Sequence, residues 1–216
     1  MDRTIIKSLN IGLPKKEEFH GKEIFTGICK TPVTEPLHLG KRGLEGDGVG
    51  DPRHHGGYDK AVCVYNVDHY QYWENLFGIT LSFAAFGENL SVSNIHEDDV
   101  CVGDVFMLGT AIVQVSQPRQ PCKTLASRYG RADMIKLVVD AGFTGFYLRV
   151  LQEGIVEKKS SFVLVNREPH RISLTFANHI LHHDRTNRQG IRKVLEVTAL
   201  SESWRKSFLE LRDKCK

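Results

Sequence analysis

The hydrophobic pattern of this chain changes character once, near residues 166–169, and that change restricts the folds open to it. Before this point, short runs rich in Val, Ile and aromatic residues are separated by Gly, Asp, Asn or Pro, which is the pattern of β-strands joined by turns. After it, apolar residues recur every three or four positions, as on the buried face of a helix. The sequence therefore predicts a β-rich domain over residues 1–166 and a helical unit over residues 167–216.

Short, closely spaced strands predict a barrel or a sandwich for the β-rich domain. The clearest expected strands are residues 60–67, 105–108, 111–115 and 162–165. Two stretches of the same domain have helical spacing instead. One is residues 68–76, where Asp68 can cap the N-terminus, and the other is residues 124–141.

Three short helices are expected in the C-terminal unit. Ser173 can cap the first, the second lies near residues 187–195, and Ser201 can cap the third. Each is close to the minimum length for a packed helix, so none is expected to be stable alone. The sequence predicts a small three-helix unit that packs on itself or on the β-rich domain.

Charge is distributed unevenly along the chain. Residues 157–216 hold 13 Lys or Arg against 7 Asp or Glu, whereas residues 1–156 hold 16 against 19. This basic excess indicates either a surface that faces an anionic partner or a solvated helical surface. It is modest and no recognised nucleic-acid motif accompanies it, so nucleic acid is not an expected ligand.

No segment of the sequence predicts a membrane anchor or a secretory signal. No apolar run reaches the roughly 18 residues that a membrane helix needs, and the first residues lack the apolar stretch of a signal peptide. The five cysteines are odd in number and none forms a CxxC pair, which argues against a disulfide framework. A cytoplasmic protein with reduced thiols is expected.

Cys122 is the cysteine with the most reactive surroundings. It ends a loop that contains two prolines, with Arg119 and Lys123 close in sequence. Nearby cations favour the thiolate, and a helix that begins near Thr124 would add to this effect. The alternative is a small apolar filler, the role expected for Cys29, Cys63 and Cys101 in their apolar runs.

A glycine-rich polar loop over residues 43–62 is the second candidate site. Glycine permits positive φ and close approach of the backbone to a ligand. Lys30, Lys41 and Arg42 precede the loop and could pair with a phosphate. A turn-rich connection without a ligand is the alternative. Direct metal binding is less favoured, because the carboxylate spacing is not that of an EF-hand.

Two further polar positions interrupt apolar runs. Asn89 follows Glu88 between apolar residues, where it could meet a ligand. Arg149 lies within a β-like run, and a buried arginine needs an anionic partner. A bound phosphate or a structural carboxylate would serve equally well.

Residues 43–62, 86–90 and 100–122, taken together in this order, resemble the MOSC domain family, the molybdenum cofactor sulfurase C-terminal domain. The resemblance runs from about residue 24 to residue 211 and is closest to the YiiM-like branch, which carries a C-terminal three-helix unit. It implies a β-barrel fold and a molybdenum cofactor (molybdopterin) whose pterin bears a phosphate.

The resemblance also implies roles for individual residues. Cys122 becomes the catalytic residue and the molybdenum ligand. The candidates for the pterin phosphate are Lys30, Lys41, Arg42 and Arg149. The candidates for binding the pterin or positioning the substrate are His55, Asp59, Asn89 and Arg119.

The activity implied by the resemblance is reduction of N-hydroxylated compounds, including hydroxylaminopurine-type bases, as a detoxification. No flavin, haem or iron–sulfur motif occurs in the sequence, so electrons would come from a separate reductase. One alternative is a sulfur carrier with a persulfide on Cys122, and another is a non-enzymatic anion-binding module. The helical unit could dock the reductase, form a homodimer or cover the cofactor.

Overall fold

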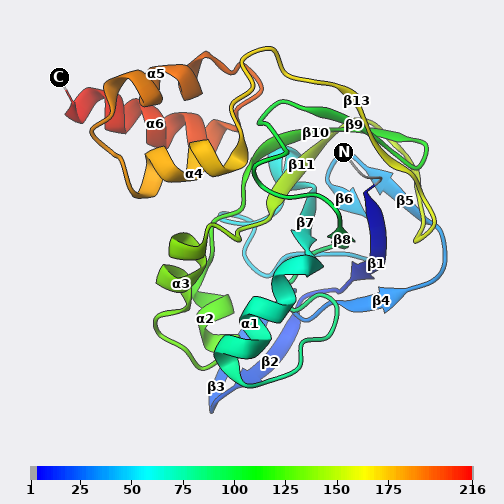
Figure 1. The fold of residues 1–216 in the computed structure, drawn as a ribbon. Coiled ribbons are helices and arrows are strands. Elements are labelled where there is room, and N and C mark those ends of the chain that lie inside the picture. The colour runs from blue at the N-terminus through cyan, green and yellow to red at the C-terminus, as the bar shows by residue number, and fades with distance from the viewer. Residues whose placement is uncertain (1–3, 216) are drawn as a thin grey trace.

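A computed structural model describes residues 4–215, which fold around one large curled sheet (Figure 1). The strands of this sheet are β1 (Ile5–Ile11), β4 (Thr31–Val33), β7 (Val62–Asn66), β8 (Leu90–Ser93), β9 (Val105–Leu108), β10 (Ala111–Pro118), β11 (Phe146–Gln152) and β13 (Phe162–Asn166). Their order is β13-β9-β10-β11-β7-β8-β1-β4. Neighbouring strands are antiparallel except β7 and β8, which are parallel. The sheet curls into half a barrel, and the expectation of a mainly β fold is confirmed.

Two small sheets extend the large one. The first contains β5 (Leu37–Gly40), β6 (Gly43–Leu44) and β12 (Gly154–Val156), and the second is the hairpin of β2 (Lys15–Phe19) and β3 (Lys22–Thr26). The turn between β5 and β6 leads into the glycine-rich loop, so this loop leaves from a fixed strand pair. No helix within residues 4–215 has the length and apolar character needed to cross a bilayer.

The single helix expected over residues 124–141 is wrong. Two helices occupy this stretch, α2 (Lys123–Arg128) and α3 (Met134–Ala141). The first ends before Gly130, which has a φ of 61°, in the left-handed region that glycine favours. A Cβ at Gly130 would lie 2.7 Å from the ring of His20, so the β2–β3 hairpin occupies the space beside this turn.

The expected cap of the first helix is also wrong. A short 3-10 turn over Val67–His69 precedes α1 (Tyr70–Phe77). The Asn66 side chain accepts a hydrogen bond from the Asp68 backbone N–H at 2.9 Å. The Asp68 carboxylate turns away and accepts from the backbone N–H of Asn94 at 3.0 Å. Asn66 caps this turn because it lies two residues before the amide, where an Asx turn forms.

The three C-terminal helices are confirmed. They are α4 (Leu174–His182), α5 (Arg188–Glu196) and α6 (Glu202–Lys214). The Ser173 hydroxyl caps α4 and the Ser201 hydroxyl caps α6, as expected, and the Asn187 side chain caps α5. Each cap satisfies a backbone N–H that would otherwise lack a partner in the first turn.

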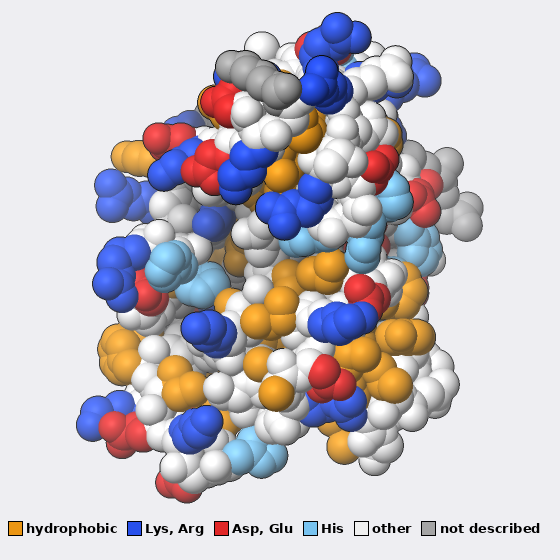
Figure 2. Space-filling model, turned by 90° about the vertical axis from the view of Figure 1, so that its left-hand side faces the viewer, with side chains coloured by type: hydrophobic (Ala, Val, Ile, Leu, Met, Phe, Trp, Pro, Cys, Tyr) orange, Lys and Arg blue, Asp and Glu red, His pale blue; other side chains and the backbone are white. Residues whose placement is uncertain are grey.

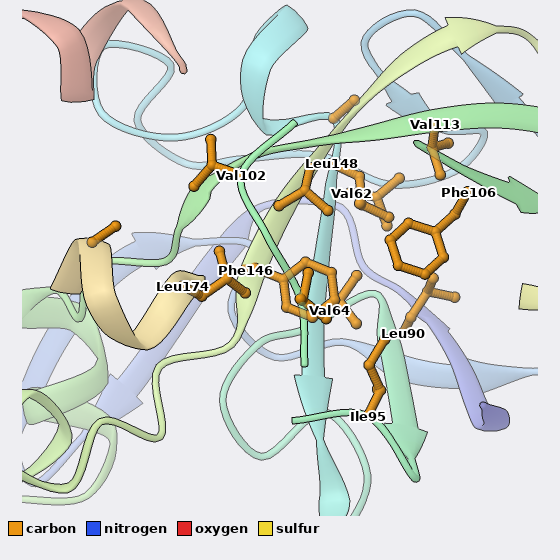
Figure 3. Close-up of a cluster of buried hydrophobic side chains, with 14 of the residues drawn as sticks. Val62, Val64, Leu90, Ile95, Val102, Phe106, Val113, Phe146, Leu148 and Leu174 are labelled. Carbon is orange, nitrogen blue, oxygen red and sulfur yellow. The ribbon is translucent and has the colours of Figure 1, made fainter. Parts of the chain in front are cut away.

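One hydrophobic core joins the large sheet to the C-terminal helices. Figure 3 shows Leu174 of α4 beside Val102 and Phe146, in the cluster that also contains Val64 and Leu90 of the sheet. Leu174 and Val102 are fully buried. Because burial of one such side chain contributes about 1.5 to 3 kcal/mol, the helical unit is held firmly against the sheet. The division of the chain at residue 166 stays a prediction.

A second core holds helices α1, α2 and α3. The rings of Tyr65 and Phe86 stack with their centroids 4.1 Å apart, and the Trp73 indole N–H donates to the Tyr65 hydroxyl at 2.6 Å. Leu125 of α2 and Met134 of α3 are fully buried in the same cluster. This packing fixes the start of α2, where Cys122 lies.

Candidate functional site

Cys122 lies at the point where the loop after β10 turns into α2. It occupies the N-cap position of α2 with an extended backbone, φ −122° and ψ 165°, and its side chain is partly exposed. The Cys122 carbonyl accepts from the Leu125 N–H at 3.1 Å, as the first helical bond does. The thiol therefore sits at the positive end of the helix dipole.

The pKa of the Cys122 thiol is lowered from its ordinary value of 9.0 to about 6. Burial alone would raise the pKa, but it is outweighed by a hydrogen bond from the His55 ring, the charge of Arg119 and the backbone N–H of Leu125. Burial raises the pKa of Cys29, Cys63 and Cys101, the three cysteines that were expected to be apolar fillers. Cys122 differs from them in favouring the thiolate near neutral pH.

Arg119 carries a charge that its protein neighbours only partly satisfy. Its side chain is 5% exposed, and Nη2 donates to the Phe86 carbonyl at 2.7 Å. Its buried Nη1 has no hydrogen-bond partner within the described part of the chain. Leaving a charged donor unpaired in the interior costs about 1 to 3 kcal/mol or more, so this atom is suited to an anionic ligand.

His55 comes to Cys122 from the glycine-rich loop. The His55 backbone N–H donates to the Asp51 carbonyl at 3.0 Å, which closes a turn, and Gly56 and Gly57 follow with φ of 72° and 82°. Two consecutive positive φ angles are accessible to glycine and reverse the chain within a short distance. The loop predicted as a site thus contributes the imidazole that lowers the pKa of the Cys122 thiol.

Lys60 belongs to this loop and was not predicted as a site residue. Burial lowers its pKa, an effect that the nearby Asp59 carboxylate opposes. The side chain is partly buried, and its ammonium donates to the His54 carbonyl at 2.9 Å. Its position just before β7, whose residues are all buried, is the sequence signal that could have identified it.

Lys30 and Asn89, two predicted cofactor ligands, meet at a third residue. The Lys30 ammonium forms an ion pair with Asp47, and the two side chains are only 6% and 11% exposed. The Asn89 amide donates to the other Asp47 oxygen at 2.8 Å, and its carbonyl accepts from the Cys63 N–H at 3.0 Å. This network braces the glycine-rich loop against β7, and a phosphate contact by Lys30 stays a prediction.

Arg149 and Asp59, both predicted to contact the cofactor, pair with each other. Arg149 Nη2 lies 2.7 Å from the Asp59 carboxylate. The second Asp59 oxygen accepts from the Glu202 backbone N–H at 3.0 Å, at the start of α6. Of the two anionic partners expected for Arg149, the structure contains the carboxylate.

Lys41 and Arg42 lie away from these contacts, at the β5–β6 turn. The Lys41 ammonium donates to the carbonyls of Val150 and Leu151, and Arg42 lies 5.1 Å from the ring centroid of Tyr58. Both line an open cavity of about 640 Å³, and Cys122 is not among its lining residues. The structure does not bring this pair to the thiol.

Basic side chains are frequent on the face that presents the C-terminal helices above α2 and α3. Figure 2 shows Lys, Arg and His side chains around the hollowed surface between the two groups of helices. Such a concentration of positive charge favours anionic ligands. Among residues 4–215, no group of three or more His, Cys, Asp or Glu side chains is arranged to hold a metal ion.

Two family models match the chain. One, described as the MOSC domain, matches residues 51–161, which include the His55 loop, Arg119 and Cys122. The other, described as the YiiM-like 3-alpha helix domain, matches residues 172–214, which include α4, α5 and α6.

Proteins similar to this chain are known from several organisms. Bacillus subtilis YflK is 48% identical over 213 residues, which cover 99% of this chain and 96% of that protein. A Gibberella moniliformis protein named Reductase is 34% identical over 155 residues, which are 68% of this chain and 27% of that protein. The crystal structure of YiiM from Geobacillus stearothermophilus has a TM-score of 0.83 and 40% identity, and the match covers 97% of this chain and 99% of that one.

Proposed function

This chain belongs to the MOSC domain family, in the branch with a YiiM-like three-helix unit, and from that premise we propose that it is a molybdenum-cofactor-dependent reductase of N-hydroxylated compounds. The observation that carries the proposal is the pairing of a low-pKa thiol at Cys122 with the buried, unpartnered Nη1 of Arg119. The fungal relative named Reductase also supports a redox activity.

The residues around Cys122 fit an anionic, metal-bearing group. A thiolate is a soft ligand of the kind that soft metals select, so Cys122 would ligate the molybdenum. Arg119 has a free guanidinium nitrogen for an oxygen of the pterin or its phosphate, and Lys60 is a second, partly buried cation on the His55 loop. MOSC domains are associated with this cofactor as a family.

The bound cofactor would supply the two-electron chemistry. The N–OH group of the substrate takes up two electrons and two protons, its N–O bond breaks, and the products are N–H and water. The residues of the chain would bind and orient the reactants. His55, whose ring helps to lower the pKa of the Cys122 thiol, would supply a proton to the departing oxygen. The water-poor surroundings of Arg119 would strengthen its attraction for the anionic group.

Electrons would reach this site from a separate reductase. The basic excess of residues 157–216 supports an acidic partner, because opposite charges steer association. Raising the salt concentration from low to physiological values should then weaken the association and slow its on-rate. Turnover with an acidic flavoprotein donor that is insensitive to salt would count against this partner.

Molybdenum content tests the proposal most directly. The wild-type chain, Cys122→Ala and Cys29→Ala would be purified from a host that makes the cofactor and measured by elemental analysis. Cys29 is a matched control, because it is also partly exposed but burial raises its pKa. Near-stoichiometric metal in the wild type and Cys29→Ala, with loss in Cys122→Ala, is expected. Equal metal in all three proteins would remove Cys122 from the metal site.

A sulfur carrier is the second candidate, and the lowered pKa of Cys122 favours it too, because the thiolate is also the form that accepts sulfur. A carrier would hold a persulfide on Cys122 and no metal. Intact mass distinguishes the two functions: an added sulfur that a reductant removes, in metal-free protein, would support the carrier. Absence of added sulfur together with bound molybdenum would support the reductase.

A further inference from the structure

We infer that the C-terminal three-helix unit positions Arg119, through hydrogen bonds from the first turn of α6 and from Asn178 of α4. One route reaches the backbone just before Arg119, and the other reaches the acceptor of the Arg119 backbone N–H. They give the helical unit a role at the Cys122 site that extends beyond its share of the hydrophobic core.

The first route starts at α6. The Ser201 backbone N–H donates to the Ser116 carbonyl at 3.0 Å, and the Ser203 hydroxyl donates to the Gln117 side-chain carbonyl at 3.0 Å. Gln117 is buried and donates in turn to the Pro118 carbonyl at 3.0 Å. The end of β10 is therefore held at successive residues immediately before Arg119.

The second route starts at α4. The Asn178 amide donates to the Thr144 hydroxyl at 3.0 Å, and this hydroxyl donates to the Gly145 carbonyl at 2.9 Å. The same Gly145 carbonyl accepts the Arg119 backbone N–H at 3.0 Å. Asn178 and Thr144 are only 5% and 1% exposed, so water does not compete for these bonds.

Gly145 makes the second route rigid. Its φ is 67°, and a Cβ there would lie 2.4 Å from the Val64 carbonyl, so the backbone is packed directly against β7. The Gly145 N–H donates to the buried Glu97 carboxylate at 2.8 Å. An acceptor fixed in this way holds the Arg119 amide in one place, and a shift of α4 would reach Arg119 through only two intervening residues.

Hydrogen exchange of the Arg119 backbone amide tests this inference in the full chain without any cofactor. In the double variant Asn178→Ala/Ser203→Ala, the amides of Arg119 and Gly145 should exchange about fivefold faster or more, as loss of a supporting hydrogen bond predicts. The single variant Ser203→Thr leaves Asn178 unchanged and keeps a hydroxyl at position 203. In this variant the amides of Arg119 and Gly145 should exchange as slowly as in the wild type. The measurement does not depend on the proposed function, which can fail while the positioning role stands.

Asn187→Ala is the matched control. Asn187 caps α5 in the same unit, through the Gly190 N–H at 2.8 Å, and contacts neither route. This variant should destabilise the unit by a comparable amount and leave the exchange of Arg119 unchanged. Unchanged exchange in the double variant would overturn the inference. So would an equal increase in Asn187→Ala, because the effect would then be one of general stability.

Discussion

Cys63 and Cys122 both lie in the field of the Arg119 guanidinium, yet the pKa values of their thiols are shifted in opposite directions. Burial raises the pKa of Cys63 to about 12, and the attraction of Arg119 only reduces this effect. The pKa of Cys122 falls to about 6, because the His55 ring and the first turn of α2 also stabilise its thiolate. A single cation is therefore not what makes Cys122 reactive.

The first prediction concerns the pH dependence of thiol alkylation in the metal-free protein. Only the thiolate is nucleophilic, so the rate at Cys122 should rise with pH and reach half its maximum near pH 6, the pKa of about 6 given by the structure. Peptide mass spectrometry after iodoacetamide pulses measures this rate. Cys63 should stay unmodified in the folded chain. A midpoint near the ordinary thiol value for Cys122 would contradict the prediction.

The second prediction separates His55 from its neighbour. His55→Ala removes the hydrogen bond to the thiolate while the burial of Cys122 remains, so the alkylation midpoint of Cys122 should move to higher pH. His54→Ala is the control, since the His54 side chain is exposed and its carbonyl serves Lys60. Equal midpoints in the two variants would show that the His55 contact does not set the pKa.

Local patterns in the sequence were sufficient for much of the fold. The boundaries of β9 match the expected strand, and Ser173 and Ser201 cap the helices that they were expected to cap. The break between α2 and α3 could not be predicted from periodicity, because apolar spacing continues across it. α2 ends before Gly130, which has a left-handed φ of 61°, and the ring of His20, far away in sequence, lies beside this turn.

The candidate site was predictable in its residue types and less so in its pairings. Arg119 and Cys122 share one loop, so their proximity follows from the sequence. The Asp59–Arg149 pair depends on the approach of a loop to β11, and no local pattern encodes it. Lys60 was not predicted, because it stands at the edge of an apolar run and resembles an ordinary strand residue.

The third prediction concerns the ion pair between Asp59 and Arg149. Asp59→Ala removes this pair and the acceptor for the Glu202 N–H, so it should lower the free energy of unfolding by about 1 to 3 kcal/mol. Asp51→Ala is the comparison, because Asp51 pairs with an exposed Arg53. Loss of this exposed pair should lower the free energy of unfolding only slightly. Urea denaturation of both variants measures the difference, and equal losses would argue against a structural role for the Asp59 pair.

The fourth prediction compares two glycines with the same backbone conformation in different surroundings. Gly142 and Gly145 have φ of 73° and 67°, so alanine at either position meets the left-handed penalty of about 1 to 2 kcal/mol. A Cβ at Gly142 meets nothing within 4 Å, whereas one at Gly145 lies 2.4 Å from the Val64 carbonyl. Displacing this backbone adds an overpacking cost, so Gly145→Ala should lose about 3 kcal/mol or more. The Gly145 carbonyl also accepts the Arg119 backbone N–H. Hydrogen exchange of the Arg119 amide should therefore be faster in Gly145→Ala and unchanged in Gly142→Ala. Similar unfolding free energies and exchange rates in the two variants would mean that the close contact with β7 relaxes without consequence.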